Sequence, residues 1–340
     1  MLRWLPLFGG SRIGAKPYLY LLVVTTIRFM ESIIKVTHLT KVFKEVTAVN
    51  DLSFTVQKGD VYGFLGQNGA GKSTTIRMLL TLISASVGDI EIFGYDLLKH
   101  RKKILRNVGA VIERPDLYKY LTAYETLQLF AKMSEVKIGK QQLMEQLELV
   151  GLAQRAHSKV RTYSQGMKQR LGIAVALVHN PELIILDEPT NGLDPQGIAD
   201  IRNLILMLSQ KMNKTILVSS HLLNEIEQIA NRMLIIDKGK KLVEGTVNEL
   251  FSPDDTVMYL ESRNNVICEN VLRSNGYGSY ITSVDAGGII LKLRKEQVPA
   301  LIKMLIENNT EILGITPRHS LEDYFLKITT ANQHVEPFKN

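Results

Sequence analysis

The sequence is poor in cysteine and in long apolar runs, and each shortage excludes a class of protein. Its 340 residues include one cysteine, Cys268, which excludes a disulfide framework and suits a reducing compartment. We expect Cys268 to be a half-buried core residue. No apolar run approaches the roughly 20 residues that span a bilayer, and the nearest candidate is residues 18–27. If the protein acts at a membrane, another polypeptide forms the path through it.

The excess of positive over negative charge is small outside the N-terminal segment. The formal net charge is +7, and the first 29 residues contain four basic residues and no acid. The remaining excess of about three is too small to predict a nucleic-acid surface, which needs a concentrated basic patch. Residues 1–29 show no clean signal-peptide cleavage site. We expect a disordered leader or a mis-assigned start, with the folded chain opening at Met30; a membrane-surface anchor is the alternative.

The sequence contains a glycine-rich stretch that directly follows a short apolar segment. Residues 66–74 read GQNGAGKST and match the phosphate-binding pattern G-x-x-x-x-G-K-[ST]. Residues 61–65 predict a buried strand and residues 75–80 a helix, which is the context that the pattern requires. Glycines let successive backbone N–H groups cradle phosphate oxygens, and the helix N-terminus adds positive charge. We therefore expect phosphate binding by Gly66, Gln67, Asn68, Gly69, Ala70, Gly71, Lys72, Ser73 and Thr74.

The rest of the pattern predicts an α/β fold. Strands at 32–38, 52–56 and 90–92 predict a β-rich lobe, with Phe43 in a polar loop and a basic helix over 97–108. Apolar strands at 108–112, 183–186, 215–219 and 232–237 predict a parallel sheet, and 241–243 a hairpin partner. Residues 115–180 are mostly helical and predict a subdomain inserted between strands. Within it, Thr122 and Glu125 form a capping-box pattern, and a second helix is expected over 140–150.

These motifs make the chain similar, over about 32–250, to the ATP-binding subunits of ABC transporters. Six motifs stand in that family's order: an adenine-stacking aromatic at Phe43, Walker A at 66–74, a Q-loop at Glu113, the signature at 164–168, Walker B at 183–187 with catalytic Glu188, and the D-loop at 191–194 with the switch histidine His221 after it. The resemblance implies a P-loop NTPase cassette spanning 30–252: a mixed β lobe, a parallel sheet and an inserted helical subdomain.

The resemblance also implies roles for individual residues in ATP hydrolysis with Mg²⁺. Ser73, Glu113 and Asp187 are the expected metal ligands. Glu188 is placed to activate the attacking water, and His221 to stabilise charge on the transferred phosphate. For Phe43, stacking on adenine competes with an ordinary position in the core. The signature residues Ser164, Gln165 and Gly166 are expected to cap ATP held by a second subunit, in a head-to-tail dimer.

Two residues depart from the family pattern. Gln165 replaces the usual first glycine of the signature, so a side chain stands where the backbone approaches phosphate. Glu113 replaces the usual Q-loop glutamine and adds negative charge near the phosphates. A glutamate at this position resembles the subfamily linked to export of bacitracin- or lantibiotic-like peptides.

The C-terminal residues predict a separate α+β unit over 255–330. The order strand, helix, strand, strand, helix, strand over 255–316 is the split βαβ arrangement. A last capped helix is expected from Ser320, and a frayed tail over 331–340. This part resembles the C-terminal tail of ATPases paired with ABC-2 type export permeases. We expect a packing or dimer-stabilising accessory without a ligand of its own.

The sequence thus predicts an ATPase subunit that powers a separate membrane permease. We expect a cytoplasmic protein held at the inner face of the membrane by that permease, as two ATPase copies, a homodimer when ATP is bound, on two permease subunits. The expected cargo is a peptide antibiotic, a lipid-like molecule or another hydrophobic compound, and no nucleic acid is expected. The alternative is a non-transport ABC ATPase that remodels a ribosome or another nucleic-acid complex. A non-catalytic ATP-binding regulator is a third reading, against which Glu188 and His221 argue.

Overall fold

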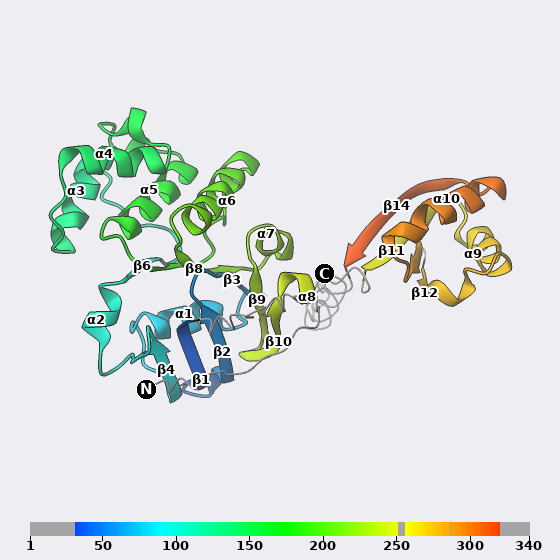
Figure 1. The fold of residues 1–340 in the computed structure, drawn as a ribbon, viewed down its shortest axis with the longest axis horizontal. Helices are drawn as coiled ribbons and strands as arrows, with labels where there is room; N and C mark the ends of the chain where they lie inside the picture. The colour runs from blue at the N-terminus through cyan, green and yellow to red at the C-terminus, as the bar shows by residue number, and fades with distance from the viewer. Residues whose placement is uncertain (1–30, 251–255, 286, 320–340) are drawn as a thin grey trace, which may run out of the picture. The chain divides into compact units, whose positions relative to one another are not determined.

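The computed structural model describes residues 31–250, 256–285 and 287–319 (Figure 1). The leader predicted over 1–29, the helix predicted from Ser320 and the tail over 331–340 lie outside the described residues. None of the described helices is long and apolar enough to cross a membrane.

A six-stranded sheet is the centre of residues 31–250. Every neighbouring pair is parallel except the antiparallel pair β9–β10, which confirms the parallel sheet with its hairpin partner. In sheet order the strands are β10 (Lys240–Thr246), β9 (Arg232–Asp237), β3 (Val61–Leu65), β8 (Thr215–Ser220), β7 (Leu183–Leu186) and β6 (Val108–Val111).

The five strands from β9 to β6 are buried on both faces, because their apolar residues run continuously rather than alternating with polar ones, whereas the edge strand β10 is exposed or half-buried. Successive side chains of a strand point to opposite faces. Val61 and Leu65 of β3 therefore belong to one hydrophobic core, shared with the helices, while Tyr62 and Phe64 belong to a second core, shared with the β-rich lobe. The carboxyl ends of β3, β7 and β8 consequently meet at one edge of the sheet, where ligands bind in such folds.

The β-rich lobe is a four-stranded antiparallel sheet with longer strands than the sequence predicted. Its order is β2 (Val46–Gln57), β1 (Ser32–Phe43), β4 (Val87–Ile92) and β5 (Tyr95–Asp96). The expectation that Phe43 lies in a loop was wrong, since it pairs with Val46 at the tip of the β1–β2 hairpin. Cross-strand hydrogen bonds carry the hairpin past the point where apolar alternation stops.

Helices cover the sheet as the sequence indicated, with one shortened. The basic helix predicted over 97–108 is α2 (Arg101–Leu105), because Asp96 Oδ1 accepts from the Lys99 N–H at 2.8 Å and turns the chain before it. The remaining helices are α1 (Lys72–Leu79), α3 (Ala123–Met133), α4 (Lys140–Leu149), α5 (Gln165–Leu177), α6 (Pro195–Gln210), α7 (Leu223–Glu227) and α8 (Val247–Leu250). Figure 1 shows α3, α4 and α5 grouped together beside α6.

The helical subdomain begins with the predicted capping box. Thr122 Oγ1 accepts from the Glu125 N–H at 3.1 Å, and Glu125 Oε2 accepts from the Thr122 N–H at 2.7 Å. These bonds satisfy backbone N–H groups at the start of α3 that have no partner within the helix, and they lower the pKa of Glu125. Leu127 of α3 and Leu143 of α4 are fully buried against α5, so one apolar cluster joins the three helices.

The C-terminal residues form a second sheet with its own core. Its order is β12 (Ile281–Val284), β13 (Ile289–Leu291), β11 (Thr256–Ser262) and β14 (Ile312–His319), antiparallel throughout, with α9 (Asn265–Ser274) and α10 (Val298–Glu307) between strands. This is the split βαβ order that the sequence predicts. Cys268 is a core residue as predicted, but it is completely rather than half buried, and burial raises the pKa of its thiol.

A hydrogen-bonded group around Glu244, which includes a buried tyrosine, joins the lobe to the central sheet. Tyr62 of β3 donates its hydroxyl hydrogen to Glu244 Oε1 of β10 at 2.8 Å. The same oxygen accepts from the Thr55 N–H of β2 at 3.4 Å, and Lys241 Nζ donates to Ser53 O of β2 at 2.8 Å. Burial and the Glu244 carboxylate raise the pKa of Tyr62 well above its usual value, so its hydroxyl stays protonated at neutral pH and keeps donating.

Tyr62→Phe is expected to destabilise the protein by about 1 kcal/mol, because it removes one buried hydrogen bond to a charged acceptor that keeps other partners. Chemical denaturation followed by fluorescence measures the change. Tyr118→Phe, whose parent residue is 59% exposed, serves as the control, with an expected change below about 0.5 kcal/mol. Equal effects of the two substitutions would contradict the role given to Tyr62.

Candidate functional site

The phosphate loop joins β3 to α1 and is shaped by glycine. Gly69 has φ 83° and Gly71 has φ 105°, values that residues with a side chain rarely adopt. A Cβ on Gly71 would lie 2.6 Å from Ala48 O, so the backbone of β2 also requires glycine there. Gly71 is the N-cap of α1, and no side chain caps this helix. The first N–H groups of α1 are therefore available to an anion.

Lys72 is a buried cation that spans the loop. Its Nζ donates to Gly66 O at 2.7 Å and to Gln67 O at 3.2 Å, and its side chain is 5% exposed. The same Nζ lies 3.1 Å from Glu188 Oε1. Since a buried charge needs a partner, Glu188 neutralises the lysine in this structure.

Glu188 stands directly beyond β7 with its carboxylate held from two sides. Oε1 faces Lys72, and Oε2 lies 2.7 Å from Nδ1 of His221, which follows β8. The Glu188 side chain is 15% exposed. Three residues from three different motifs therefore meet at one carboxylate, as the adjacency of β3, β8 and β7 allows.

Asp187 is buried with one oxygen satisfied and the other free. Oδ1 accepts from Ser219 Oγ at 2.6 Å, and the residue is 1% exposed. Oδ2 has no hydrogen-bond partner in the part of the chain that the structure describes. A buried carboxylate oxygen without a partner fits a cation. The described residues hold no cluster of three or more His, Cys, Asp or Glu side chains suited to a metal.

Glu113 lies outside the Lys72–Glu188–His221 cluster. It follows β6 with φ 55°, and its side chain is 61% exposed. Arg77 of α1 forms an ion pair and a hydrogen bond with its carboxylate. Arg77 thus offsets the negative charge that glutamate adds at the Q-loop position. The sequence analysis did not predict this partner.

Phe43 and the signature residues lie apart from the Lys72–Glu188–His221 cluster. The Phe43 ring is 45% exposed with Lys41 Nζ 4.8 Å from its centroid, so it is not a core aromatic. Ser164 caps α5, accepting from the Met167 N–H at 3.2 Å, and Gln165 and Gly166 open that helix. Among the described residues, no hydrogen bond or ion pair joins these three to the phosphate loop.

The sequence reading also missed Ser219, whose hydroxyl contacts both acids. It accepts from the Glu188 N–H at 2.9 Å while donating to Asp187. The available signal was a polar residue at the end of the apolar run 215–218, one strand away from the acids in the sheet.

A glycine-shaped loop at a helix N-terminus, with a buried lysine and paired acids at the ends of parallel strands, defines a P-loop nucleoside triphosphatase. Residues 49–191 match the family model described as ABC transporter. The chain is 45% identical over 303 residues to the bacitracin transport ATP-binding protein of Bacillus licheniformis, covering 88% of this chain and 98% of that protein. It is 39% identical over 211 residues to the lantibiotic transport ATP-binding protein of Streptococcus pyogenes, covering 62% and 90%.

Solved structures agree with these relatives. A dimeric ATP-binding cassette in a post-hydrolysis state, bound to ADP and phosphate, matches with a TM-score of 0.57 and 25% identity, covering 63% of this chain and 98% of that one. The chain therefore belongs to the ATP-binding proteins of ABC transporters. It is the ATP-hydrolysing subunit that works with a separate permease.

Proposed function

We propose that this chain drives export of a peptide antibiotic, with Glu188 as the catalytic base. The observation that carries the catalytic part is the contact of one carboxylate with both Lys72 and His221 beside the phosphate loop. The transport class rests on the bacitracin and lantibiotic transport relatives.

The contacts of Lys72 suggest how nucleotide binding prepares the base. The β- and γ-phosphates of ATP carry more negative charge than one carboxylate, so they compete for Lys72 and free Glu188 Oε1 to hold the attacking water. His221 stays bonded to the other oxygen and orients the carboxylate. The roles proposed for Gly66 to Thr74 are backbone and hydroxyl contacts to phosphate.

Three side chains are proposed to hold Mg²⁺ with the nucleotide: Ser73, Asp187 and Glu113. The free Oδ2 of Asp187 and the N-terminal position of Ser73 in α1 support the first two. For Glu113 the proposal requires exchange of Arg77 for the metal. The ion, when bound, neutralises charge that develops on the phosphates.

The signature residues are proposed to complete the site of a second copy. Ser164, Gln165 and Gly166 open α5 at the surface, where helix N–H groups favour an anion. The half-exposed ring of Phe43 suits stacking on adenine. Both groups need a nucleotide or a partner to act on, which fits the dimeric cassette to which the chain is similar.

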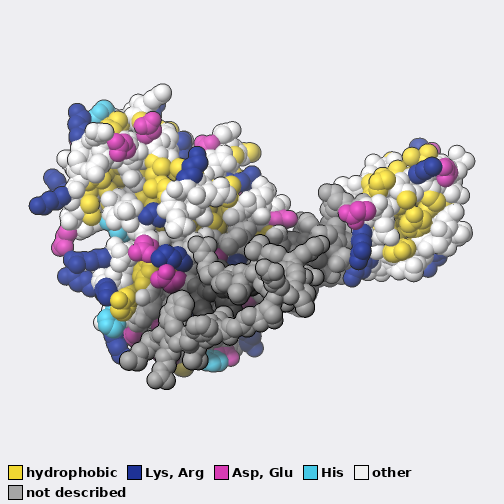
Figure 2. Space-filling view, viewed as in Figure 1, with side chains coloured by type: hydrophobic (Ala, Val, Ile, Leu, Met, Phe, Trp, Pro, Cys, Tyr) yellow, Lys and Arg dark blue, Asp and Glu magenta, His cyan; other side chains and the backbone are white. Residues whose placement is uncertain are grey.

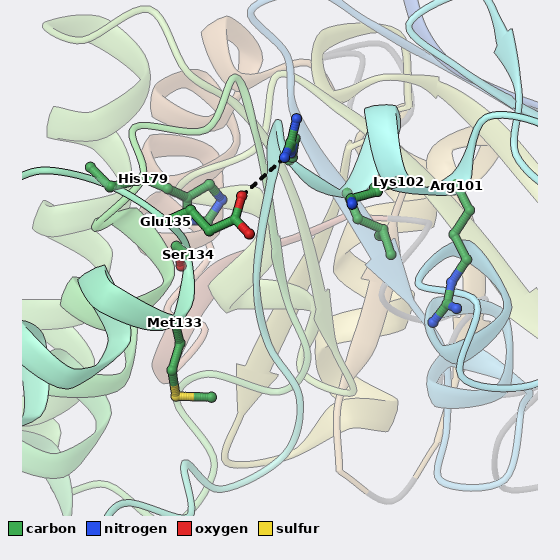
Figure 3. Close-up of a pocket in the computed structure, with 9 residues that line it drawn as sticks. Arg101, Lys102, Met133, Ser134, Glu135 and His179 are labelled. Carbon is green, nitrogen blue, oxygen red and sulfur yellow. Dashed lines mark hydrogen bonds and ion pairs between the residues drawn. The ribbon is translucent and has the colours of Figure 1, made fainter.

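The permease is proposed to dock beside the helical subdomain and to hold this chain at the cytoplasmic face of the membrane. Tyr118 and Tyr120, in the loop before α3, are 59% and 80% exposed. A cavity of about 870 Å³ opens between α2 and the C-terminal end of α3, with the Arg106–Glu135 ion pair across it (Figure 3). Exposed aromatic side chains and a hollow between subdomains are features of interaction surfaces.

Charge distribution favours this reading over remodelling of a nucleic-acid complex. On the face drawn in Figure 2, Lys and Arg side chains of residues 31–250 stand in separate groups with Asp and Glu between them. Nucleic-acid surfaces gather their basic residues on one face or stripe.

Glu188→Gln is expected to bind ATP with near-normal affinity and to lower kcat at least 100-fold, because the amide cannot take a proton from water. It should also accumulate as an ATP-bound dimer, measured by size exclusion with ATP. Glu182→Gln, which changes an exposed residue just before the other end of β7, is the matched control. Turnover by Glu188→Gln equal to that of the control would remove Glu188 from the catalytic role.

Glu113→Gln is expected to keep most ATPase activity and Glu113→Ala to lose most of it, with the Mg²⁺ dependence shifted in both. An amide oxygen still ligates a cation, whereas a methyl group does not. Mg²⁺ titrations of ATP hydrolysis measure the shift, and Arg77→Ala separates the ion pair from metal binding. Superimposable titrations for all the proteins would show that Glu113 does not approach the metal.

The transport function is tested by purifying the tagged chain from detergent-solubilised membranes of its own cells and identifying what accompanies it. We expect a six-helix permease encoded beside its gene, and Tyr118→Ala with Tyr120→Ala should weaken that complex. Tyr95→Ala, at the lobe, should not. Recovery of ribosomal components and no membrane protein would favour the alternative function.

A further inference from the structure

Ser219 lies between the two acids on which hydrolysis depends. It is the fifth residue of β8 and is completely buried. Its hydroxyl oxygen accepts from the Glu188 N–H at 2.9 Å and its hydrogen goes to Asp187 Oδ1 at 2.6 Å. A single side chain on the neighbouring strand therefore contacts both residues.

The backbone explains why a side chain is needed at this point. The regular pairing of β7 with β8 ends at Leu186 and Val218. The Asp187 N–H, like that of Leu183, points to the β6 side of the strand and donates to Val111 O at 2.9 Å, so it makes no bond to β8. The next residue, Glu188, has φ 48°, in the left-handed region that is sparsely populated without glycine. The Ser219 hydroxyl supplies the acceptor that the ladder no longer offers to the Glu188 N–H.

The direction of the two hydrogen bonds also fixes the orientation of the Asp187 carboxylate. Because the hydroxyl oxygen accepts from a backbone N–H, its one hydrogen is free to point at Oδ1. Oδ1 is thereby occupied, and Oδ2 is the oxygen without a partner among the described residues. The hydroxyl thus selects which oxygen of Asp187 faces the ligand.

We propose that Ser219 is a positioning residue that holds the Asp187 carboxylate and the Glu188 backbone in register with Lys72 and His221. This inference rests on the roles proposed above for Asp187 and Glu188. Ser219 touches neither nucleotide nor metal in the proposal, and acts only through the two acids.

The test is Ser219→Ala, which removes the hydroxyl and little volume. Loss of position near a reacting centre costs about 10- to 100-fold in rate, so kcat should fall within that range. Affinity for a fluorescent ATP analogue in EDTA should change less than twofold, because the phosphate loop is untouched. The increase in that affinity on adding Mg²⁺ should shrink several-fold, since Asp187 Oδ2 is no longer held; this second readout needs no turnover.

Thr215→Val is the matched control on the same strand. Thr215 is 1% exposed at the opposite end of β8, and its Oγ1 accepts from the Gly59 N–H at 2.9 Å. It therefore loses the same kind of buried bond to a backbone N–H, away from the site. We expect a similar fall in Tm and no change in kcat or in the Mg²⁺ effect.

Ser219→Thr, which keeps the hydroxyl, should retain kcat within about fivefold of the wild type, since only misplacement is costly. If Ser219→Ala does not fold, Ser219→Cys gives the same comparison with a weak donor of similar size. A Ser219→Ala protein whose kcat and Mg²⁺ effect match those of Thr215→Val would overturn the positioning role. If Ser219→Ala has wild-type kcat and a wild-type Mg²⁺ effect while Glu188→Gln is inactive, this inference alone is wrong. If Glu188→Gln is active, the proposed function is wrong.

Discussion

The buried carboxylate of Glu188, paired with Lys72 on one side and His221 on the other, is the interaction on which the site depends. Taking these charges out of water is costly, and only close partners offset that cost. The arrangement requires the ends of β3, β7 and β8 to lie side by side, which the strand order provides. In the function proposed above, it also makes Glu188 the group that ATP displaces from Lys72, so that substrate binding and release of the base would be one event.

Burial of the central sheet on both faces makes that arrangement rigid. Strands β3, β6, β7, β8 and β9 give alternate side chains to the helical core and to the lobe core, so none of them can shift by one residue without exchanging its two sets of side chains. The bonds from Thr55 to Glu244 and from Lys241 to Ser53 add polar links between lobe and sheet, and Tyr62 donates to the same Glu244 carboxylate. These links hold the lobe, which carries Phe43, in a fixed position relative to the phosphate loop at the edge of the sheet.

The same chain carries groups that its own site does not use. Ser164 to Gly166 and the Phe43 ring are exposed or partly exposed and lack contact with the Lys72–Glu188–His221 cluster. In the proposed dimer these residues would contact nucleotide held between the two copies. Nucleotide binding would then shift the equilibrium between open and closed dimers toward the closed one. Glu113 with Arg77 has a similar character, because an exposed ion pair is weak and easily exchanged.

The local sequence pattern by itself determined most of the secondary structure and the phosphate loop of this protein. Continuous apolar runs predicted the buried strands, the glycine spacing predicted the phosphate loop, and Thr122 with Glu125 predicted the start of α3, because each of these rests on neighbours in sequence. Only the tertiary structure decided what depends on pairing between distant segments. Phe43 extends a hairpin through cross-strand bonds, Arg77 meets Glu113 across 36 residues, and Ser219 reaches Asp187 and Glu188 because β8 lies beside β7. A serine at the end of an apolar run has no local signature of its partner, and the sheet register alone brings the two together.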